Sequence, residues 1–279
     1  GVVVATAYPG TPSTEILENL ARYKTVNVEW SCNEKVALEV ATGASFSGAR
    51  TLVAMKHVGL NVAADPLMTL AYTGISGGMV IVTADDPGMH SSQNEQDNRF
   101  YARFAGIPML EARDSDGARR LTKQALSLSE QYDTPVLLRI TTRISHSKGV
   151  IRLEEPEPRP PLERNPLQPS KYVMLPSFAR ARAAVKLERL KKLREETEKW
   201  VFEEEGIGGD RSTGVITAGI CYNYVREAAP DLDLLCLTMT YPLPEAAIKG
   251  FAENHERIVV IEELDTYLTD QIRAMGIET

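Results

Sequence analysis

Two spacings of apolar side chains alternate along the first half of the chain. Short apolar runs typical of buried strands lie at residues 2–7, 26–30, 51–55, 79–83, 108–110 and 136–139. Between these runs, apolar side chains recur every three or four residues, which predicts helices over residues 13–23, 34–47, 61–72, 93–104 and 115–132. Regular alternation of strands and helices predicts a mostly parallel sheet with right-handed crossovers and helices on both faces. The predicted fold class is therefore α/β, with three αβα layers.

The alternation stops near residue 150. Seven of the sixteen prolines lie between residues 156 and 176, a density typical of a stiff, extended linker. Residues 178–205 are rich in Ala, Leu, Lys, Arg and Glu and predict one amphipathic helix. Its apolar stripe consists of Leu190, Leu193, Thr197 and Trp200. We expect this stripe to pack on a domain or a partner rather than to form a coiled-coil dimer.

The same rhythm resumes near residue 213. Predicted strands at 215–218, 234–237 and 258–261 alternate with predicted helices near 220–229, 244–254 and 266–275. This pattern predicts a second, smaller three-layer domain. The expected organisation is a first domain over residues 1–150, a Pro-rich linker with a charged helix over residues 151–212, and a second, incomplete domain over residues 213–279.

Composition narrows the classes of function. Hydrophobic side chains make up 43% of the chain and charged ones 25%, as in ordinary soluble globular proteins. The net charge of −7 leaves none of the basic excess that nucleic-acid binding requires. No apolar run reaches the roughly eighteen residues that span a bilayer, and no basic segment precedes the first apolar run. We therefore expect a cytoplasmic protein that binds neither membranes nor nucleic acid.

The sequence offers no metal site. The scattered Cys32, Cys221 and Cys236 form no C-x-x-C pair, which predicts free thiols in a reducing compartment and no zinc or iron–sulfur ligand set. Proline and glycine follow the acidic pair at residues 85–86, so a turn with side-chain acceptors explains this pair better than a metal site does. The pair at residues 262–263 is explained by a helix N-terminus, where acids complement the helix dipole.

A turn at residues 8–13 follows the first predicted strand. Pro9 and Gly10 favour a tight bend, and Pro12 suits the first position of a helix, which makes Thr11 the predicted N-cap. Open α/β sheets bind ligands at the carboxyl ends of their strands, so helix amides and the Thr11 hydroxyl could hold a substrate carboxylate here. Taken alone, the turn is more simply explained as a capped helix start.

A single carboxylate, Glu34, opens the helix after Asn33. One interpretation is an acid that complements the helix dipole. The helix has little side-chain bulk, with small residues at positions 37, 41, 43, 44, 45, 48 and 49, so a ligand or a second surface can approach closely. A carboxyl group held partly dry there would be poised for proton exchange. The residues alone leave both interpretations open.

Several linked motifs resemble the 2-oxoacid:ferredoxin oxidoreductase family, and within it the large subunits of members that oxidise indolepyruvate. In the first domain these motifs are residues 8–13, 33–37, 43–44, 48–51, 56–61 and 96–99. In the second domain they are residues 238–244 and 260–265. The resemblance covers nearly all of the first 150 residues. It implies a thiamine diphosphate pyrimidine-binding domain followed by a transketolase C-terminal-like domain.

The resemblance also implies roles for individual residues. Glu34 matches the glutamate that hydrogen-bonds N1′ of the thiamine aminopyrimidine and so promotes loss of the thiazolium C2 proton. Thr11 matches the threonine that meets the 2-oxoacid carboxylate. The loop at residues 57–61 is expected near the cofactor. His57 and Asn61 are assigned there as substrate contacts, and positions 58 and 59 (Val58 and Gly59) as cofactor contacts.

Parts of such an enzyme are missing from this sequence. Residues 208–211 do not match the family's Gly-Asp-Gly motif, so Mg²⁺ and the diphosphate are expected to be held mainly by a C-terminal domain or separate subunit. The resemblance implies 4Fe-4S clusters elsewhere in the complex, a small gamma- or beta-type subunit, ferredoxin, coenzyme A and a dimer of heterodimers. The expected reaction is oxidative decarboxylation of an aryl 2-oxoacid, such as indolepyruvate, to acyl-CoA. We expect this chain alone to be insufficient for activity.

Two alternatives remain open. One is half of a split thiamine-dependent decarboxylase or transketolase, which keeps the cofactor but has no redox step. The other is a non-catalytic assembly subunit, in which an apolar face of the first domain and the charged helix bind partners.

Overall fold

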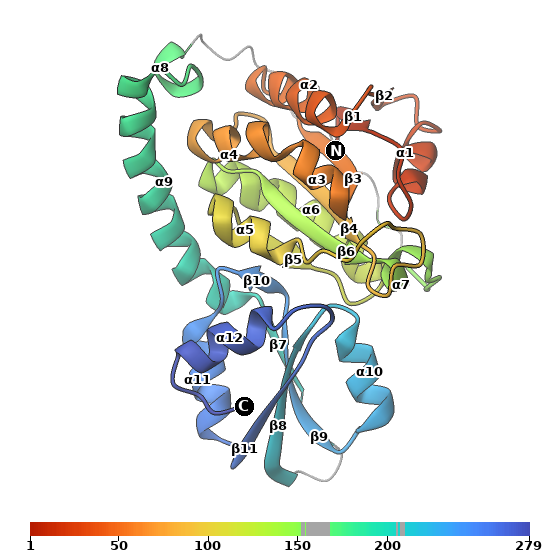
Figure 1. The fold of residues 1–279 in the computed structure, drawn as a ribbon, viewed down its shortest axis with the longest axis vertical. Helices are drawn as coiled ribbons and strands as arrows, with labels where there is room; N and C mark the ends of the chain where they lie inside the picture. Colours follow the sequence, from red (N-terminus) through yellow and green to blue (C-terminus); the bar gives the residue numbers. More distant parts are fainter. Residues whose placement is uncertain (152–153, 155–167, 205, 207–209) are drawn as a thin grey trace.

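The computed structural model describes residues 1–151, 154, 168–204, 206 and 210–279 (Figure 1). Most of the predicted Pro-rich linker lies outside the described residues. The described strands form a seven-stranded sheet in the order β10-β5-β6-β4-β3-β1-β2 and a four-stranded sheet in the order β11-β8-β9-β7. Both sheets are mostly parallel, which confirms the predicted α/β class.

The first sheet follows the predicted alternation. Its parallel strands are β1 (Val4–Ala7), β2 (Asn27–Trp30), β3 (Thr51–Lys56), β4 (Met79–Asp85), β5 (Met109–Glu111) and β6 (Val136–Thr141). Its helices are α1 (Thr14–Leu20), α2 (Glu34–Phe46), α3 (His57–Val62), α4 (Ala64–Thr73), α5 (Arg99–Ala105), α6 (Ser115–Tyr132) and α7 (Thr142–His146). Helices α3 and α4 replace the single predicted helix over residues 61–72, and the sequence analysis missed α7.

Helices cover both faces of this sheet. Strand β4 is buried along its whole length, and its side chains point alternately into two apolar cores. Val80 packs in the core under α1 and α6, whereas Ile81 packs in the core under α2, α4 and α5. A strand buried on both faces needs a continuous apolar run, which is why its sequence shows no polar alternation.

Strand β10 (Met239–Tyr241) comes from the second half of the chain but belongs to the first sheet. It pairs antiparallel with β5, and the amide of Glu111 donates to the carbonyl of Thr238 at 2.9 Å. The sequence analysis placed residues 238–244 in the second domain and missed this strand. An edge strand of three residues followed by a proline carries no periodic signal.

The second sheet contains β7 (Val201–Glu204), β8 (Asp210–Ala218), β9 (Leu232–Leu237) and β11 (Arg257–Ile261). Helix α10 (Cys221–Ala228) packs on one of its faces, and α11 (Glu245–Glu253) and α12 (Tyr267–Ala274) pack on the other. Strand β7 is antiparallel to β9. Every strand and helix predicted after residue 213 is present.

The predicted helix over residues 178–205 is wrong at its C-terminal end. Helix α9 (Pro176–Glu196) is followed by a 3₁₀ turn, η1 (Thr197–Lys199), and then by β7. Val201 and Phe202 favour a strand, and pairing with β9 covers an open sheet edge. The α-helix therefore ends before Trp200, which the prediction had included in the apolar stripe.

Helix α9 docks on the C-terminal end of α4 (Figure 1). Arg182 donates to the carbonyls of Tyr72 and Thr73, each at 2.9 Å, and to the Asp133 carboxylate at 2.9 Å. Arg189 also reaches Asp133, at 3.1 Å. Cations at a helix C-terminus bind its free carbonyls and complement its dipole. The helix thus packs on a domain, as expected, and the short helix α8 (Pro169–Tyr172) precedes it. No helix within the described residues is long and apolar enough to cross a bilayer.

Candidate functional site

Three motifs meet at one edge of the first sheet. Strand β1 lies between β2 and β3 and is parallel to both. Thr11 follows β1, Glu34 follows β2, and Gly59 lies in the helix that follows β3. The carboxyl ends of neighbouring parallel strands form the usual ligand-binding edge of an open α/β sheet.

Glu34 is the first residue of α2. The Asn33 side chain caps this helix by accepting a hydrogen bond from the amide of Val36 at 2.9 Å. Glu34 as a whole residue is 8% exposed, and its side chain forms no hydrogen bond or ion pair with the residues that the structure describes. Carboxylates are rarely this buried without a partner, because a dry charge is costly. A carboxylate left in this state is suited to a ligand that supplies the missing hydrogen-bond partner.

Gly59 provides the space that the Glu34 side chain occupies. A Cβ atom at position 59 would lie 2.5 Å from Oε1 of Glu34 and 2.7 Å from its Cγ. Any larger residue would displace the carboxylate. The role of Gly59 in this structure is therefore to leave room for the Glu34 side chain. The sequence alone did not predict this contact.

The segment at residues 57–62 is a helix, α3, and not the expected loop. His57 is fully buried, and its Nε2 faces the carbonyl of Asn94 at 3.1 Å. Val58 is half-buried. The exposed Asn61 donates to Gln96 at 2.8 Å and accepts from Tyr101 at 2.6 Å. The structure therefore brings Gly59 to Glu34 but directs His57 and Asn61 to other residues.

Thr11 is not the N-cap of α1, because the helix begins at Thr14. The amide of Gly10 donates to the hydroxyl of Thr14 at 2.9 Å, and the hydroxyl of Ser13 donates to the carbonyl of Gly10 at 2.8 Å. The amide of Ser13 also donates to the carbonyl of Gly10 at 2.8 Å, so residues 10–13 close a turn before the helix begins. Thr11 is left exposed at the sheet edge.

Thr11 lines a cleft of about 580 Å³. The other lining residues are His90, Ser91, Thr142, Arg143, His146, Ser147, Ile220 and Tyr224. No acidic residue is among them, although the net charge of the chain is −7. Arg143 is exposed and forms no ion pair with the described residues. The cleft therefore suits an anionic ligand.

The acidic pair at the end of β4, Asp85 and Asp86, is structural. Asp86 accepts hydrogen bonds from the Ser91 amide at 2.8 Å and from the Ser92 and Thr142 hydroxyls, each at 2.6 Å. Burial raises the pKa of Asp86, but these hydrogen bonds outweigh burial and lower the pKa overall. Asp85 instead accepts from Arg139 at 2.7 Å. No cluster of metal ligands occurs within the described ranges, and a turn begins at Asp86, whose carbonyl accepts from the amide of Met89 at 3.0 Å.

The sequence analysis missed the side chains on the far walls of the cleft. Arg143 and His146 lie in α7, and Tyr224 lies in α10 of the second sheet. The position of α7 follows from the carboxyl end of β6, a strand that the sequence predicts. The contribution of Tyr224 depends on how the two sheets face each other, and no local pattern reports that orientation.

Comparison with known proteins defines the class to which this fold and site belong. A family model described as pyruvate flavodoxin/ferredoxin oxidoreductase, thiamine diphosphate-binding, matches residues 1–199. The chain therefore belongs to this thiamine diphosphate-binding family.

Curated relatives are named indolepyruvate oxidoreductase subunit IorA. Those from Archaeoglobus fulgidus and Methanothermobacter thermautotrophicus are each 43% identical over 99% of this chain, which covers 46% of either relative. The relative from Pyrococcus horikoshii is 40% identical over 99% of this chain and 44% of its own length. The chain thus spans less than half the length of these relatives.

Solved structures share the fold. A 2-oxoglutarate:ferredoxin oxidoreductase from Magnetococcus marinus, with 2-oxoglutarate, coenzyme A and succinyl-CoA bound, matches with a TM-score of 0.79 and 19% identity, over 99% of this chain and 57% of that one. A split-gene transketolase, an inactive β4 tetramer, matches with a TM-score of 0.61 and 14% identity, over 97% and 79%. At such identities the likeness establishes the α/β fold alone.

Proposed function

We propose that this chain is the cofactor-activating part of a 2-oxoacid:ferredoxin oxidoreductase that converts an aryl 2-oxoacid, such as indolepyruvate, to its acyl-CoA. The names of the curated relatives support the substrate and reaction class. The observation that carries the proposal is the Glu34 carboxylate, which is buried without a partner against Gly59 at the carboxyl edge of the sheet.

Glu34 fits the aminopyrimidine of thiamine diphosphate. Its carboxyl group would hydrogen-bond N1′ and hold or release a proton there, which is general acid–base work by a side chain. The bound cofactor would supply the nucleophilic carbon and the electron sink for decarboxylation. Gly59 and the small side chains of α2 leave room for a flat ring beside the carboxylate.

Thr11 would orient the substrate. Its hydroxyl lies in a cleft with Arg143 and without carboxylates, so a 2-oxoacid carboxylate finds a donor and a positive charge there. His57 and Asn61 remain secondary candidates for substrate contacts, and Val58 remains one for a cofactor contact. All three lie in α3, the helix that borders Glu34.

The remaining assignments are part of the same proposal. Residues 1–150 form the pyrimidine-binding domain, residues 151–212 form the linker and docking helix, and residues 213–279 form a transketolase C-terminal-like domain. Mg²⁺, the diphosphate and the 4Fe-4S clusters would be held mainly by another domain or subunit. The partners would be a small gamma- or beta-type subunit, coenzyme A and ferredoxin. The complex would be a dimer of heterodimers in the cytoplasm.

The proposal is tested by Glu34→Gln in the assembled complex. Hydrogen–deuterium exchange at C2 of bound thiamine diphosphate, followed by NMR, should slow at least about 100-fold, the range that general acid–base groups contribute. Glu39→Gln, an exposed change on the same helix, is the matched control and should leave exchange unchanged. Normal exchange in Glu34→Gln would refute the role of Glu34 and favour a non-catalytic assembly subunit.

A further inference from the structure

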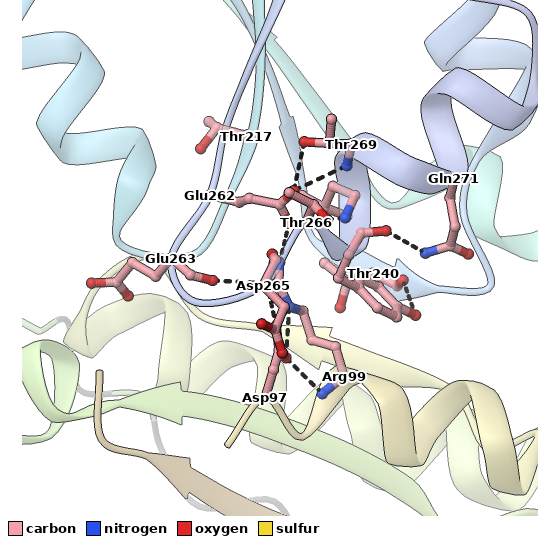
Figure 2. Close-up of polar contacts among 12 residues, drawn as sticks. Asp97, Arg99, Thr217, Thr240, Glu262, Glu263, Asp265, Thr266, Thr269 and Gln271 are labelled. Atoms are coloured by element: carbon pink, nitrogen blue, oxygen red, sulfur yellow. Dashed lines mark hydrogen bonds and ion pairs between the residues drawn. The ribbon is translucent and has the colours of Figure 1, made fainter. Parts of the chain in front are cut away.

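Two motifs that the proposed function leaves unexplained are joined in the structure. Residues 96–99 precede and begin α5, and residues 262–265 connect β11 to α12. Figure 2 shows Arg99 reaching from the first segment to the second. Arg99 is 1% exposed, and its guanidinium donates to the Glu262 carboxylate at 2.8 Å and to the carbonyls of Glu263 and Asp265 at 2.8 and 3.2 Å.

Both ends of this contact are held firmly. Asp97 accepts from Nε of Arg99 at 2.9 and 3.0 Å, which orients the guanidinium plane. Glu262 also accepts from the amides of Leu268 and Thr269, at 2.8 and 3.0 Å, so it caps α12 while it binds Arg99 (Figure 2). A displacement of the β11–α12 loop therefore moves Arg99 as well.

The same four-residue segment holds α3 on its other side. Asn98 is fully buried, and its side-chain amide donates to the carbonyl of His57 at 3.2 Å and to the hydroxyl of Thr83. Gln96 donates to the same His57 carbonyl at 3.1 Å and accepts from Asn61 at 2.8 Å. Both ends of α3 are thus attached to the segment that carries Arg99.

Helix α3 in turn confines Glu34. Gly59 lies in the middle of α3, and its Cα faces the Glu34 carboxylate closely enough to exclude a methyl group. A small shift of α3 therefore either crowds Glu34 or leaves it unsupported. Displacements of about 1 Å at a reacting group can change rates roughly 100-fold.

We propose that residues 96–99 are a positioning device for Glu34: Gln96 and Asn98 fix α3, and Arg99 couples α3 to the β11–α12 loop. The inference rests on the proposed function of Glu34. It makes Gln96, Asn98 and Arg99 positioning residues that act through α3 on the proton-transfer group. It also gives the second sheet a role in catalysis without any contact to the cofactor.

The coupling is tested first without cofactor, by hydrogen–deuterium exchange of backbone amides in the cofactor-free complex. Glu262→Gln removes the charge that binds Arg99. Peptides that cover residues 57–62 should exchange about tenfold faster, a change within the range of couplings in one hydrogen-bond network. Glu256→Gln, at an exposed position just before β11, is the control and should not change their exchange. Faster exchange confined to the β11–α12 loop would overturn the proposal.

The consequence for Glu34 is tested with C2 exchange of bound thiamine diphosphate in the loaded complex. Asn98→Asp should slow exchange about 10- to 100-fold, as loss of an orienting outer contact does at other sites. Asn94→Asp is the matched control, because its side chain is exposed and no hydrogen bond within the described residues uses it. Gln96→Ala, at a half-buried position, should slow exchange in the same direction and covers the case in which Asn98→Asp does not fold.

Glu34→Gln in the same series separates the two proposals. If Glu34→Gln abolishes exchange but Asn98→Asp and Gln96→Ala match wild type, the positioning role is wrong and the proposed function stands. If Glu34→Gln exchanges normally, the proposed function fails, and the positioning role fails with it. Slow exchange in Glu34→Gln, Asn98→Asp and Gln96→Ala, with Asn94→Asp normal, supports both.

Discussion

The Glu34 carboxylate lies directly on Gly59, and a Cβ atom at position 59 would come within 2.5 Å of Oε1 and 2.9 Å of Cδ. These are atoms near the end of a flexible side chain, so Gly59→Ala should fold and move the carboxylate. We expect C2 exchange of bound cofactor to slow about 100-fold in this variant, because the proton-transfer group is misplaced.

Gly43→Ala is the control for Gly59→Ala. Gly43 lies in α2, and a Cβ there would meet nothing within 4 Å. It should leave exchange intact and stabilise the protein by about 0.5–1 kcal/mol, because alanine restricts the unfolded chain in a helix. Normal exchange in Gly59→Ala would show that this contact does not position Glu34.

The cleft beside Thr11 should bind the substrate carboxylate. Arg143→Gln removes its positive charge, and we expect the KM for the 2-oxoacid to rise about tenfold with kcat little changed, since a charged hydrogen bond is lost in binding. Thr11→Val should act in the same direction. Steady-state kinetics of the complex measure both, with Arg180→Gln, exposed on α9, as the control. An unchanged KM in both variants would show that the 2-oxoacid carboxylate binds elsewhere.

Glu263 should make the stability of the fold depend on pH. Burial raises the pKa of its carboxyl group, and the facing Glu111 adds to this effect, whereas Arg139, Thr141 and Arg143 oppose it. A raised pKa means that the folded state binds the proton more tightly than the unfolded state, so ionised Glu263 costs stability above the folded pKa.

Glu263→Gln removes this cost. Its Tm should exceed that of wild type at neutral pH, and the difference should shrink as the pH falls through the folded pKa and vanish below the unfolded value of about 4.3. Calorimetry across this range measures the difference, with Glu256→Gln as the exposed control. A Tm difference that grows on acidification has the opposite sign and would rule out this explanation.

Arg182 should hold α9 on the first domain. Arg182→Ala loses two backbone acceptors at the end of α4 and the ion pair with Asp133, so we expect destabilisation by about 1–3 kcal/mol. The urea midpoint of unfolding reports this loss, and Arg180→Ala on the same helix should leave it unchanged. Equal midpoints for the two variants would mean that Arg182 does not stabilise the docking of α9.

Many helices and strands could be predicted from the spacing of apolar residues along the sequence. The bounds of α6 match the prediction of residues 115–132, because its sequence is long and strongly amphipathic. Strands β7 and β10 were missed, since short edge strands are stabilised by distant partners, β9 and β5, and not by local preference. The N-cap predicted at Thr11 was wrong, because residues 10–13 close a turn through the hydrogen bond from the Ser13 amide to the Gly10 carbonyl, and the helix begins only at Thr14.

Individual residues of the site could be predicted from the sequence, but the contacts between them could not. Glu34 and Gly59 were each singled out, yet they lie after different strands, and only the order of β2, β1 and β3 in the sheet brings α2 and α3 together. The contact of Arg99 with Glu262 joins residues 163 positions apart. It depends on how two sheets face each other, which no local pattern encodes.

A structure of the complex with thiamine diphosphate bound tests the central claim most directly. We predict an oxygen of Glu34 within about 3.2 Å of N1′ of the aminopyrimidine, the distance of a hydrogen bond. A Glu34 carboxylate turned into solvent, or an N1′ bound by a different side chain, would contradict the account.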